Sequence, residues 1–340
     1  MTTIGERNRN RSVSFRTEQL DALHGVAALC VVLNHYVQMV PETIRQAVSV
    51  SGLGNVEGWT SRWKWLHYTL LRLMISGQAA VMMFFVLSGF VPFASLHGRG
   101  GISWTSFLFR RFNRIYVPFA AVISAAALAY QSADPVPSAV SSDWLNGLLL
   151  MPGIYSFPAH LLMTGEPEGM TLNLAVWTLI HEMRVALFIP ALFVLCQAAG
   201  AIKATAILLA SFDRVRADFP VGLGARLVVS LCLFSNLVTR TLNSRLPRWL
   251  GRISYSLYLG HLPILIVNLG AGAPLIALPL VMTMILVVSA LMYRFLEAPA
   301  QRFASHGAKR LLAMKRPLLE KKLLGWHSHL AAGWQLRGRA

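Results

Sequence analysis

Apolar residues in this sequence come in long runs rather than in the short stretches typical of strands. Runs of about 18 or more apolar residues are typical of transmembrane helices, because such a helix crosses the roughly 30 Å apolar core of a bilayer. The pattern predicts an all-α, polytopic membrane helix bundle of about eight transmembrane helices. Spans are expected near residues 20–40, 70–96, 113–131, 173–196, 201–212, 222–241, 253–270 and 274–293.

Two apolar stretches do not fit a simple crossing. The segment 201–212 is short for a helix that must cross the bilayer. The segment 143–163 is interrupted by Pro152, Gly153 and Pro158. We expect this second segment to be re-entrant, because irregular backbone at membrane depth is tolerated where protein buries it.

Composition supports the membrane assignment. The 340 residues are 55% hydrophobic and only 13% charged, about half the charged fraction of a typical soluble domain. The net charge of +17 comes from Arg and Lys gathered between and after the spans. Such segments face the cytoplasm and its anionic lipids. The lipid bilayer is therefore the expected partner, and no nucleic acid is expected, because no nucleic-acid-binding module accompanies the charge.

The charge distribution also sets an orientation. Basic residues mark the N-terminus and residues 97–114 and 240–252 as cytoplasmic, whereas the loops 132–143 and 164–172 contain acidic residues but no Lys or Arg and are expected outside. Eight spans would place both termini in the cytoplasm. The chain then divides into a basic N-terminal segment 1–19, a transmembrane domain 20–293 and a basic C-terminal tail 294–340.

The first predicted span contains four polar groups, Asp21, His24, Asn34 and His35. Ionisable groups inside a membrane are costly and often functional. His24 and His35 are eleven residues apart, about three helical turns, so both lie on one face about 16 Å apart along the axis. His24 is expected toward the cytoplasm and His35 toward the far side. The alternative is that these groups only form hydrogen bonds between helices.

Two later spans also hold polar groups. Glu182 is expected in the outer half of the span 173–196, at a depth near His35, where a carboxylate can orient a histidine base. The alternative is that Glu182 pairs with Arg184 or a neighbouring span. His261 falls near the middle of the span 253–270, where it could line a pocket, the alternative being a packed polar contact.

Three arginines, Arg110, Arg111 and Arg114, abut the membrane on the cytoplasmic side at spacings that share a helical face. Guanidinium groups bind phosphates bidentately, so this motif could clamp the phosphates of a substrate. The alternative is that the arginines only anchor the topology. No metal site is expected, because the three cysteines lie in apolar runs at spacings that match none.

Six segments carry a resemblance to a known family. In chain order they are LDALHGVAALCVVLNH, FFVLSGF, FLFRRFNRIYVPF, WTLIHEMRVALFIP, LGRISYSLYLGH and YRFLEAPAQRF. Together they extend from about residue 16 to residue 303. On these segments the chain resembles the membrane-bound acyltransferase-3 family, bacterial integral-membrane O-acyltransferases that modify sugars and lipids.

The resemblance implies a bundle of about ten spans that moves an acyl group, by family habit acetyl, from cytoplasmic acyl-CoA to an acceptor hydroxyl. The expected acceptor is a cell-envelope or exported carbohydrate or a glycolipid, and the expected location is the bacterial inner membrane. Acetyl-CoA would be a co-substrate, with no bound cofactor.

The resemblance also implies residue roles. His35 would be the catalytic base, with Glu182 as its orienting partner, and the three arginines would hold the CoA phosphates. On their own chemistry, the polar side chains expected to contact substrate are His24, Asn34, Trp177 and His261, and either Asn34 or Trp177 would donate to the oxyanion. His24 stands where the family usually has Arg, a departure, because an imidazole can be neutral and lacks the guanidinium fork.

Two other functions fit parts of the pattern. Intramembrane His and Glu also suit a transporter or flippase of a sugar or lipid, although no internal repeat is visible. An inactive homologue that serves as an assembly partner is the other alternative, and His24 motivates it.

Overall fold

The computed structural model describes residues 4–39, 74–97, 104–133, 143–148, 156–164, 172–199, 235–270, 278–311 and 313–314. Every regular element within these ranges is helical, and they contain no strand. The predicted all-α fold is therefore confirmed.

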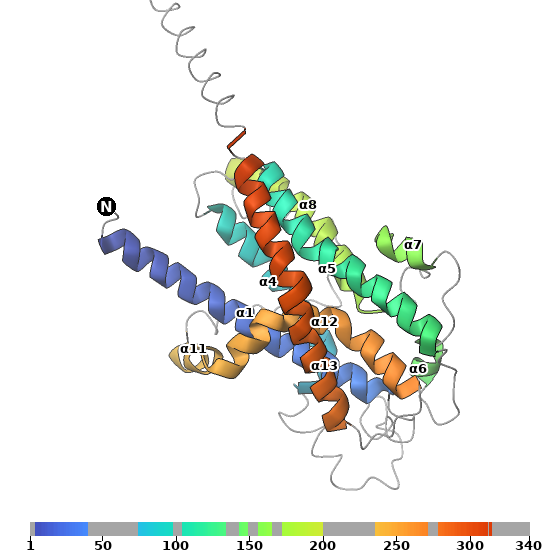
Figure 1. Ribbon diagram of the computed structural model, residues 1–340. Helices are drawn as coiled ribbons and strands as arrows, with labels where there is room; N and C mark the ends of the chain where they lie inside the picture. The colour runs from blue at the N-terminus through green and yellow to red at the C-terminus, as the bar shows by residue number, and fades with distance from the viewer. Residues whose placement is uncertain are drawn as a thin grey trace, which may run out of the picture.

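Long helices make up most of the described chain (Figure 1). They are α1 (Ile4–Met39), α4 (Gly77–His97), α5 (Trp104–Ala133), α8 (Val176–Ala199), α12 (Arg245–Gly270) and α13 (Leu278–Met292). Shorter elements are α6 (Asp143–Leu148), α7 (Ser156–Leu161), α11 (Asn236–Leu242) and the π-helical turn η5 (Tyr293–Glu297).

Four helices within the described ranges are long and apolar enough to cross a membrane. They are Glu18–Gln38, Trp104–Ala133, Arg245–Asn268 and Pro279–Leu311, and Gly77–Val91 is a shorter apolar helix. The predicted span 201–212 and most of the predicted span 222–241 lie outside the described residues. The count of eight to ten spans and the cytoplasmic placement of both termini therefore stay predictions.

The segment 143–163, expected to be re-entrant, contains the two short helices α6 and α7. Each has six residues, which corresponds to a length of about 9 Å. Neither is long enough to cross a bilayer. Residues 149–155 between them lie outside the described part of the chain.

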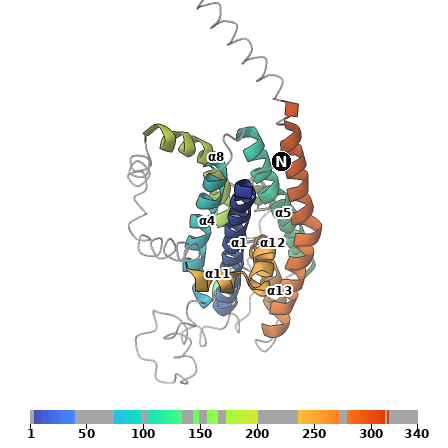
Figure 2. The same cartoon turned by 90° about the vertical axis from the view of Figure 1, so that its left-hand side faces the viewer.

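Helices α1 and α12 lie at the centre of the bundle and pack along each other (Figure 2). On either side, α4 packs against α1 and α13 packs against α12, while α8 contacts α4 and α5. The main core includes Phe119, Ile180 and Leu257, each at most 2% exposed. Helices far apart in the sequence thus share one apolar interior.

Two glycines bring α1 and α12 into backbone contact. A Cβ atom on Gly25 would overlap the backbone of Gly251, and a Cβ atom on Gly251 would overlap the carbonyl group of Asp21. Small residues at such crossings allow helices to approach closely. The crossing fixes which residues of the two helices can meet further along.

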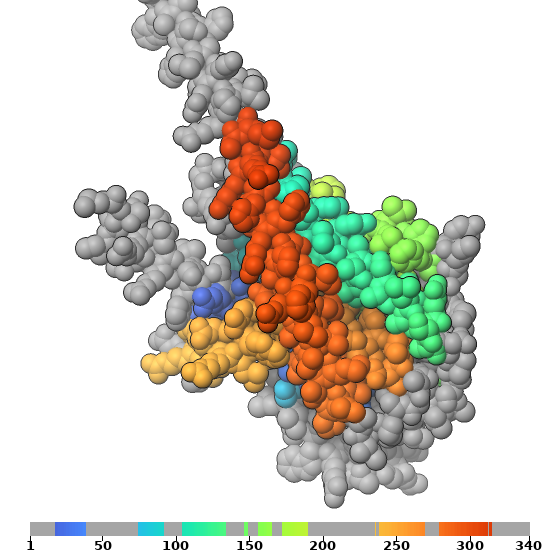
Figure 3. Space-filling view, viewed as in Figure 1, coloured from blue at the N-terminus to red at the C-terminus, as the bar shows by residue number. Residues whose placement is uncertain are grey.

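Helical structure continues past residue 293, the expected end of the transmembrane domain. The chain continues from α13 through the π turn η5 and stays helical to residue 311. Figure 3 shows this stretch as one ridge along the surface of the bundle. The π turn lies just before Pro299, a residue with no N–H to donate to a regular helix. The predicted domain boundary at 293 stays a prediction.

Candidate active site

His35 and His261 form a pair between the two central helices, in which His261 is buried and His35 is half-buried. His35 Nδ1 lies 2.8 Å from His261 Nε2, and the rings stack with centroids 5.1 Å apart and planes 8° from parallel. His261 is 0% exposed. The sequence singled out both residues, but it did not predict that they touch.

Two backbone carbonyl groups determine which ring nitrogens of this pair carry a hydrogen. His261 Nδ1 lies 2.6 Å from the carbonyl oxygen of Tyr258 and 3.2 Å from that of Leu257. A carbonyl oxygen only accepts, so His261 Nδ1 carries the hydrogen, and Nε2 of the neutral ring carries a lone pair. That lone pair accepts from His35 Nδ1–H. In the neutral pair, His35 Nε2 is then the unprotonated nitrogen, which is the state a base needs.

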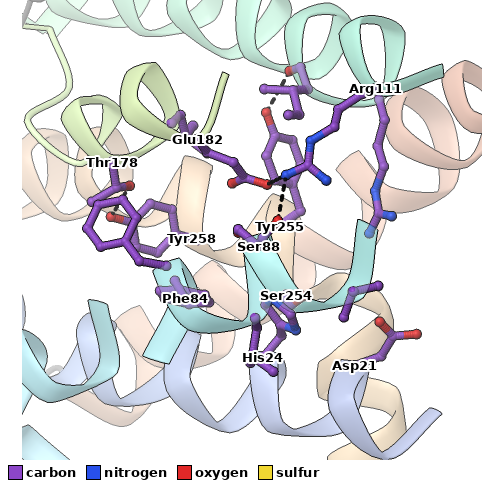
Figure 4. A pocket seen from close by; sticks show the side chains of 16 residues that line it. Asp21, His24, Phe84, Ser88, Arg111, Thr178, Glu182, Ser254, Tyr255 and Tyr258 are labelled. Atoms are coloured by element: carbon purple, nitrogen blue, oxygen red, sulfur yellow. Dashed lines mark hydrogen bonds and ion pairs between the residues drawn. The ribbon is translucent and has the colours of Figure 1, made fainter. Parts of the chain in front are cut away.

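A pocket opens closer to the N-terminal end of α1. Its empty volume is about 890 Å³, including space open to solvent. Helices α1, α4, α5, α8 and α12 all contribute to it, as Figure 4 shows. Its polar lining residues are Asp21, His24, Ser88, Arg111, Arg114, Thr178, Glu182, Ser254, Tyr255 and Tyr258.

An ion pair between α5 and α8 forms one wall of this pocket. Arg111 Nη2 donates to Glu182 Oε1 at 3.0 Å and also faces the carbonyl oxygen of Ser88 at 3.2 Å. The Arg111 side chain is 14% exposed and that of Glu182 is 25% exposed. Arg111 Nε is buried without a hydrogen-bond partner within the described part of the chain. The guanidinium is thus fixed on one edge and still has donor capacity.

Asp21 and His24 lie on the opposite wall, on α1 (Figure 4). His24 Nδ1 lies 2.9 Å from the carbonyl oxygen of Leu20 one turn earlier. Glu182, Asp21 and Arg114 line the same pocket as His24. The pocket therefore combines two carboxylates, two guanidinium groups and an imidazole.

Glu182 does not lie at the depth expected from the sequence. Gly77, at the start of α4, lies against Asn34, the neighbour of His35. Ser88 lies eleven residues after Gly77 along α4, a distance of about 16 Å. Arg111 donates hydrogen bonds both to the carbonyl oxygen of Ser88 and to Glu182. Glu182 thus belongs with His24 and Arg111, and the ring that contacts His35 is that of His261.

The arginine motif divides into two groups. Arg111 and Arg114 line the pocket, whereas Arg110 does not and its Nε donates to the carbonyl oxygen of Ser106. All three lie on α5, but the direction of each side chain depends on the residues packed around it. The spacing of the arginines in the sequence does not predict this direction.

The remaining expected contact residues lie outside the pocket lining. Trp177 packs edge-on against Phe85 with ring centroids 5.9 Å apart. Asn34 lies beside Gly77. Sequence reasoning missed Tyr258, whose carbonyl oxygen fixes His261 and whose side chain lines the pocket. The available signal was its position three residues before His261 in SYSLYLGH, which places both on one helical face.

Comparisons with known proteins identify the family of the chain. A curated relative, the O-acetyltransferase PaAT-1 of Phomopsis amygdali, is 28% identical over 184 residues. That alignment covers 50% of this chain and 35% of the relative, so the chain spans about a third of the relative's length. No solved structure matches the chain. The family model for an acyltransferase domain, acyltransferase-3, matches residues 17–212, more than half of the chain, and includes His35 and Glu182 but not His261. The chain therefore belongs to the acyltransferase-3 family.

Proposed function

We propose that this protein is a membrane O-acyltransferase that moves an acetyl group from acetyl-CoA to a hydroxyl group of a carbohydrate or glycolipid. The observation that carries the proposal is the His35–His261 pair, in which a buried, fully bonded histidine leaves a second histidine with a basic nitrogen. Glu182, expected from the sequence to orient the base, contacts Arg111. His261 takes the orienting role in this proposal.

The reaction is an acyl exchange between sulfur and oxygen. His35 Nε2 accepts the proton of the acceptor hydroxyl while the hydroxyl oxygen attacks the thioester carbonyl carbon. A C–O bond forms, the C–S bond breaks, and the proton returns from His35 to the leaving thiolate. General-base catalysis of this kind contributes about 10²–10⁴-fold.

The pocket is the proposed site for the phosphate end of the donor. Arg111 and Arg114 supply two guanidinium groups there, and guanidinium groups bind phosphates in a bidentate manner. His24 lines the pocket, and His35 belongs to the histidine pair. The two residues are eleven positions apart on α1, which is about 16 Å along the helix axis. The arm that links the phosphates to the thioester would extend over this distance.

The acceptor and the location are part of the same proposal. We assign the bacterial inner membrane, with acyl-CoA on the cytoplasmic side and a cell-envelope or exported glycan or glycolipid as acceptor. The choice of acetyl is supported by the relative from Phomopsis amygdali, which is named an O-acetyltransferase. The four apolar helices support the bilayer as its surroundings.

The test is acyl transfer in proteoliposomes that contain the purified full-length protein. They receive [¹⁴C]acetyl-CoA and a cell-envelope glycan extract, with His35→Ala measured alongside. We expect label in the glycan fraction with wild type and a loss of about 10²-fold or more with the variant. Equal thermal unfolding of the two proteins would show that the variant is folded.

Two results would contradict the proposal. One is intact acetyl-CoA and unlabelled glycan with wild type under all acceptor conditions tried. The other is labelled glycan of equal amount with wild type and His35→Ala. Movement of unmodified glycan across the vesicle membrane would instead support a transporter.

A further inference from the structure

A chain of aromatic rings separates the pocket from the histidine pair. The centroid of His24 lies 5.7 Å from that of Phe84. Phe84 meets Tyr258 edge-on at 5.1 Å, and Tyr258 lies 5.8 Å from His261. Phe84 and Tyr258 both line the pocket, whereas His35 and His261 do not. The rings of Phe84 and Tyr258 therefore lie between the pocket that is the proposed phosphate site and the His35–His261 pair that is the proposed base.

The two rings are held very differently. The hydroxyl of Tyr258 lies 2.7 Å from Thr178 Oγ1 and 3.2 Å from the carbonyl oxygen of Ala175, and Tyr258 is only 4% exposed. Phe84 has no polar atom and is half-buried, so packing alone holds its ring. Tyr258 is thus the fixed side of this barrier and Phe84 the side that can rotate.

We propose that Phe84, working against the fixed ring of Tyr258, selects the size of the acyl group that reaches the histidine pair. This inference rests on the proposed function. The acyl group is the leading end of a thioester arm that extends from the pocket toward His35. It must therefore pass these rings first, so the opening that Phe84 leaves favours short acyl chains over long ones.

The test compares donors that differ only in acyl length. Full-length protein in proteoliposomes is given acetyl-CoA, butanoyl-CoA or octanoyl-CoA with the acceptor extract used for acetyl transfer. The variants are Phe84→Leu, Phe84→Ala and Phe84→Trp. The measured quantity is the ratio of kcat/KM for octanoyl-CoA to that for acetyl-CoA, because a ratio is insensitive to the amount of active protein.

We expect the ratio to rise by about tenfold or more in Phe84→Leu and further in Phe84→Ala, since a change of one methylene in an apolar pocket is worth about 10–200-fold. Phe84→Trp should lower it. Phe84→Leu keeps an apolar side chain with good helix propensity, so it tests the inference even where the alanine variant does not fold.

Phe85→Leu is the matched control. Phe85 is the next residue of α4 and lines the same pocket, but its ring packs against Trp177 and His181, at 5.9 Å and 6.3 Å, and not toward Tyr258. The same loss of volume at Phe85 should leave the donor ratio within about twofold, which is below the effect of one methylene.

The outcomes distinguish this inference from the proposed function. If wild type transfers none of the three acyl groups, the proposed function fails. If wild type transfers acetyl but uses octanoyl-CoA equally well, or if Phe84→Leu and Phe84→Ala transfer acetyl with an unchanged ratio, the proposed function stands and the role of Phe84 is wrong. A ratio that rises equally in Phe85→Leu would also overturn it.

Discussion

Gly251 lies directly against the backbone of Gly25, ten residues before each helix presents its histidine to the other. The two helices run in the same direction, and the offset between Gly25 and Gly251 equals that between His35 and His261. One register therefore sets both contacts, about 15 Å apart along the helices. The glycine crossing positions the histidine pair without taking part in it.

Replacing Gly251 by Ala should separate α1 from α12. The new Cβ would overlap the backbone at Asp21, and overpacking of this kind costs about 1–3 kcal/mol. We expect a lower unfolding temperature in detergent together with a loss of acyl transfer, because the shift also moves His261 away from His35.

Gly89→Ala is the control for this substitution. Among the described residues, a Cβ at Gly89 would meet no atom within 4 Å beyond the backbone of its own helix. The helix-interior change should therefore be neutral or stabilising by up to about 1 kcal/mol. Equal unfolding temperatures for the Gly251 and Gly89 variants would mean that the crossing is not tight.

His261→Phe should lower kcat by about 10²-fold, within the range that general-base catalysis provides. Phenylalanine fills the space but cannot accept from His35 Nδ1–H, so the base loses its orientation. His261→Gln should retain more activity, because a side-chain carbonyl oxygen can accept that hydrogen bond. Steady-state kinetics with varied acetyl-CoA would show the loss in kcat with KM nearly constant. Wild-type turnover in the phenylalanine variant would exclude a catalytic pair.

Arg114→Gln should raise the KM for acetyl-CoA by about fivefold, the effect of losing one solvated charge contact of about 1 kcal/mol. The reason is that Arg114 lines the pocket. Arg110→Gln should leave this KM unchanged, because Arg110 lies outside the lining and bonds to the backbone of Ser106. Equal increases in both variants would indicate a diffuse effect of surface charge instead of a defined phosphate site.

Ser256→Ala should destabilise the fold by about 1–3 kcal/mol, since it removes a hydrogen bond to a buried acidic group. Ser256 Oγ lies 2.7 Å from Glu297 Oε2, and Glu297 is only 2% exposed. Thermal unfolding in detergent measures the effect. The exposed Ser305→Ala offers a comparison that should change stability by less than about 0.5 kcal/mol. A Ser256 variant as stable as the Ser305 variant would show that Glu297 does not depend on this bond.

The helices could be predicted from the sequence because bilayer-length apolar runs leave the backbone no alternative that satisfies its hydrogen bonds. The polar groups of α1 were equally visible, because each stands out within an apolar run. Their partners were not visible. His35 contacts a residue 226 positions away, and which side chains meet depends on a helix crossing that two glycines permit.

The depth of Glu182 within the bundle could not be predicted reliably, for the same reason. Counting residues from the expected membrane edge placed Glu182 near His35, but α8 begins at Val176 and its contacts with α5 and α4 place Glu182 beside Arg111. A sequence gives the order of residues along each helix. The vertical offset between neighbouring helices comes from side-chain packing, which a single sequence does not display.

The distance in sequence between the two histidines has a consequence for biogenesis. At a synthesis rate of about 5–20 residues per second, α1 is made roughly 10–45 s before the segment that carries His261. During that interval the helix with Asp21, His24 and His35 has none of its contacts with α12. Helix α4, which packs against α1 and is made soon after it, is already present during this interval. The contact between His35 and His261 therefore forms late in the synthesis of each chain.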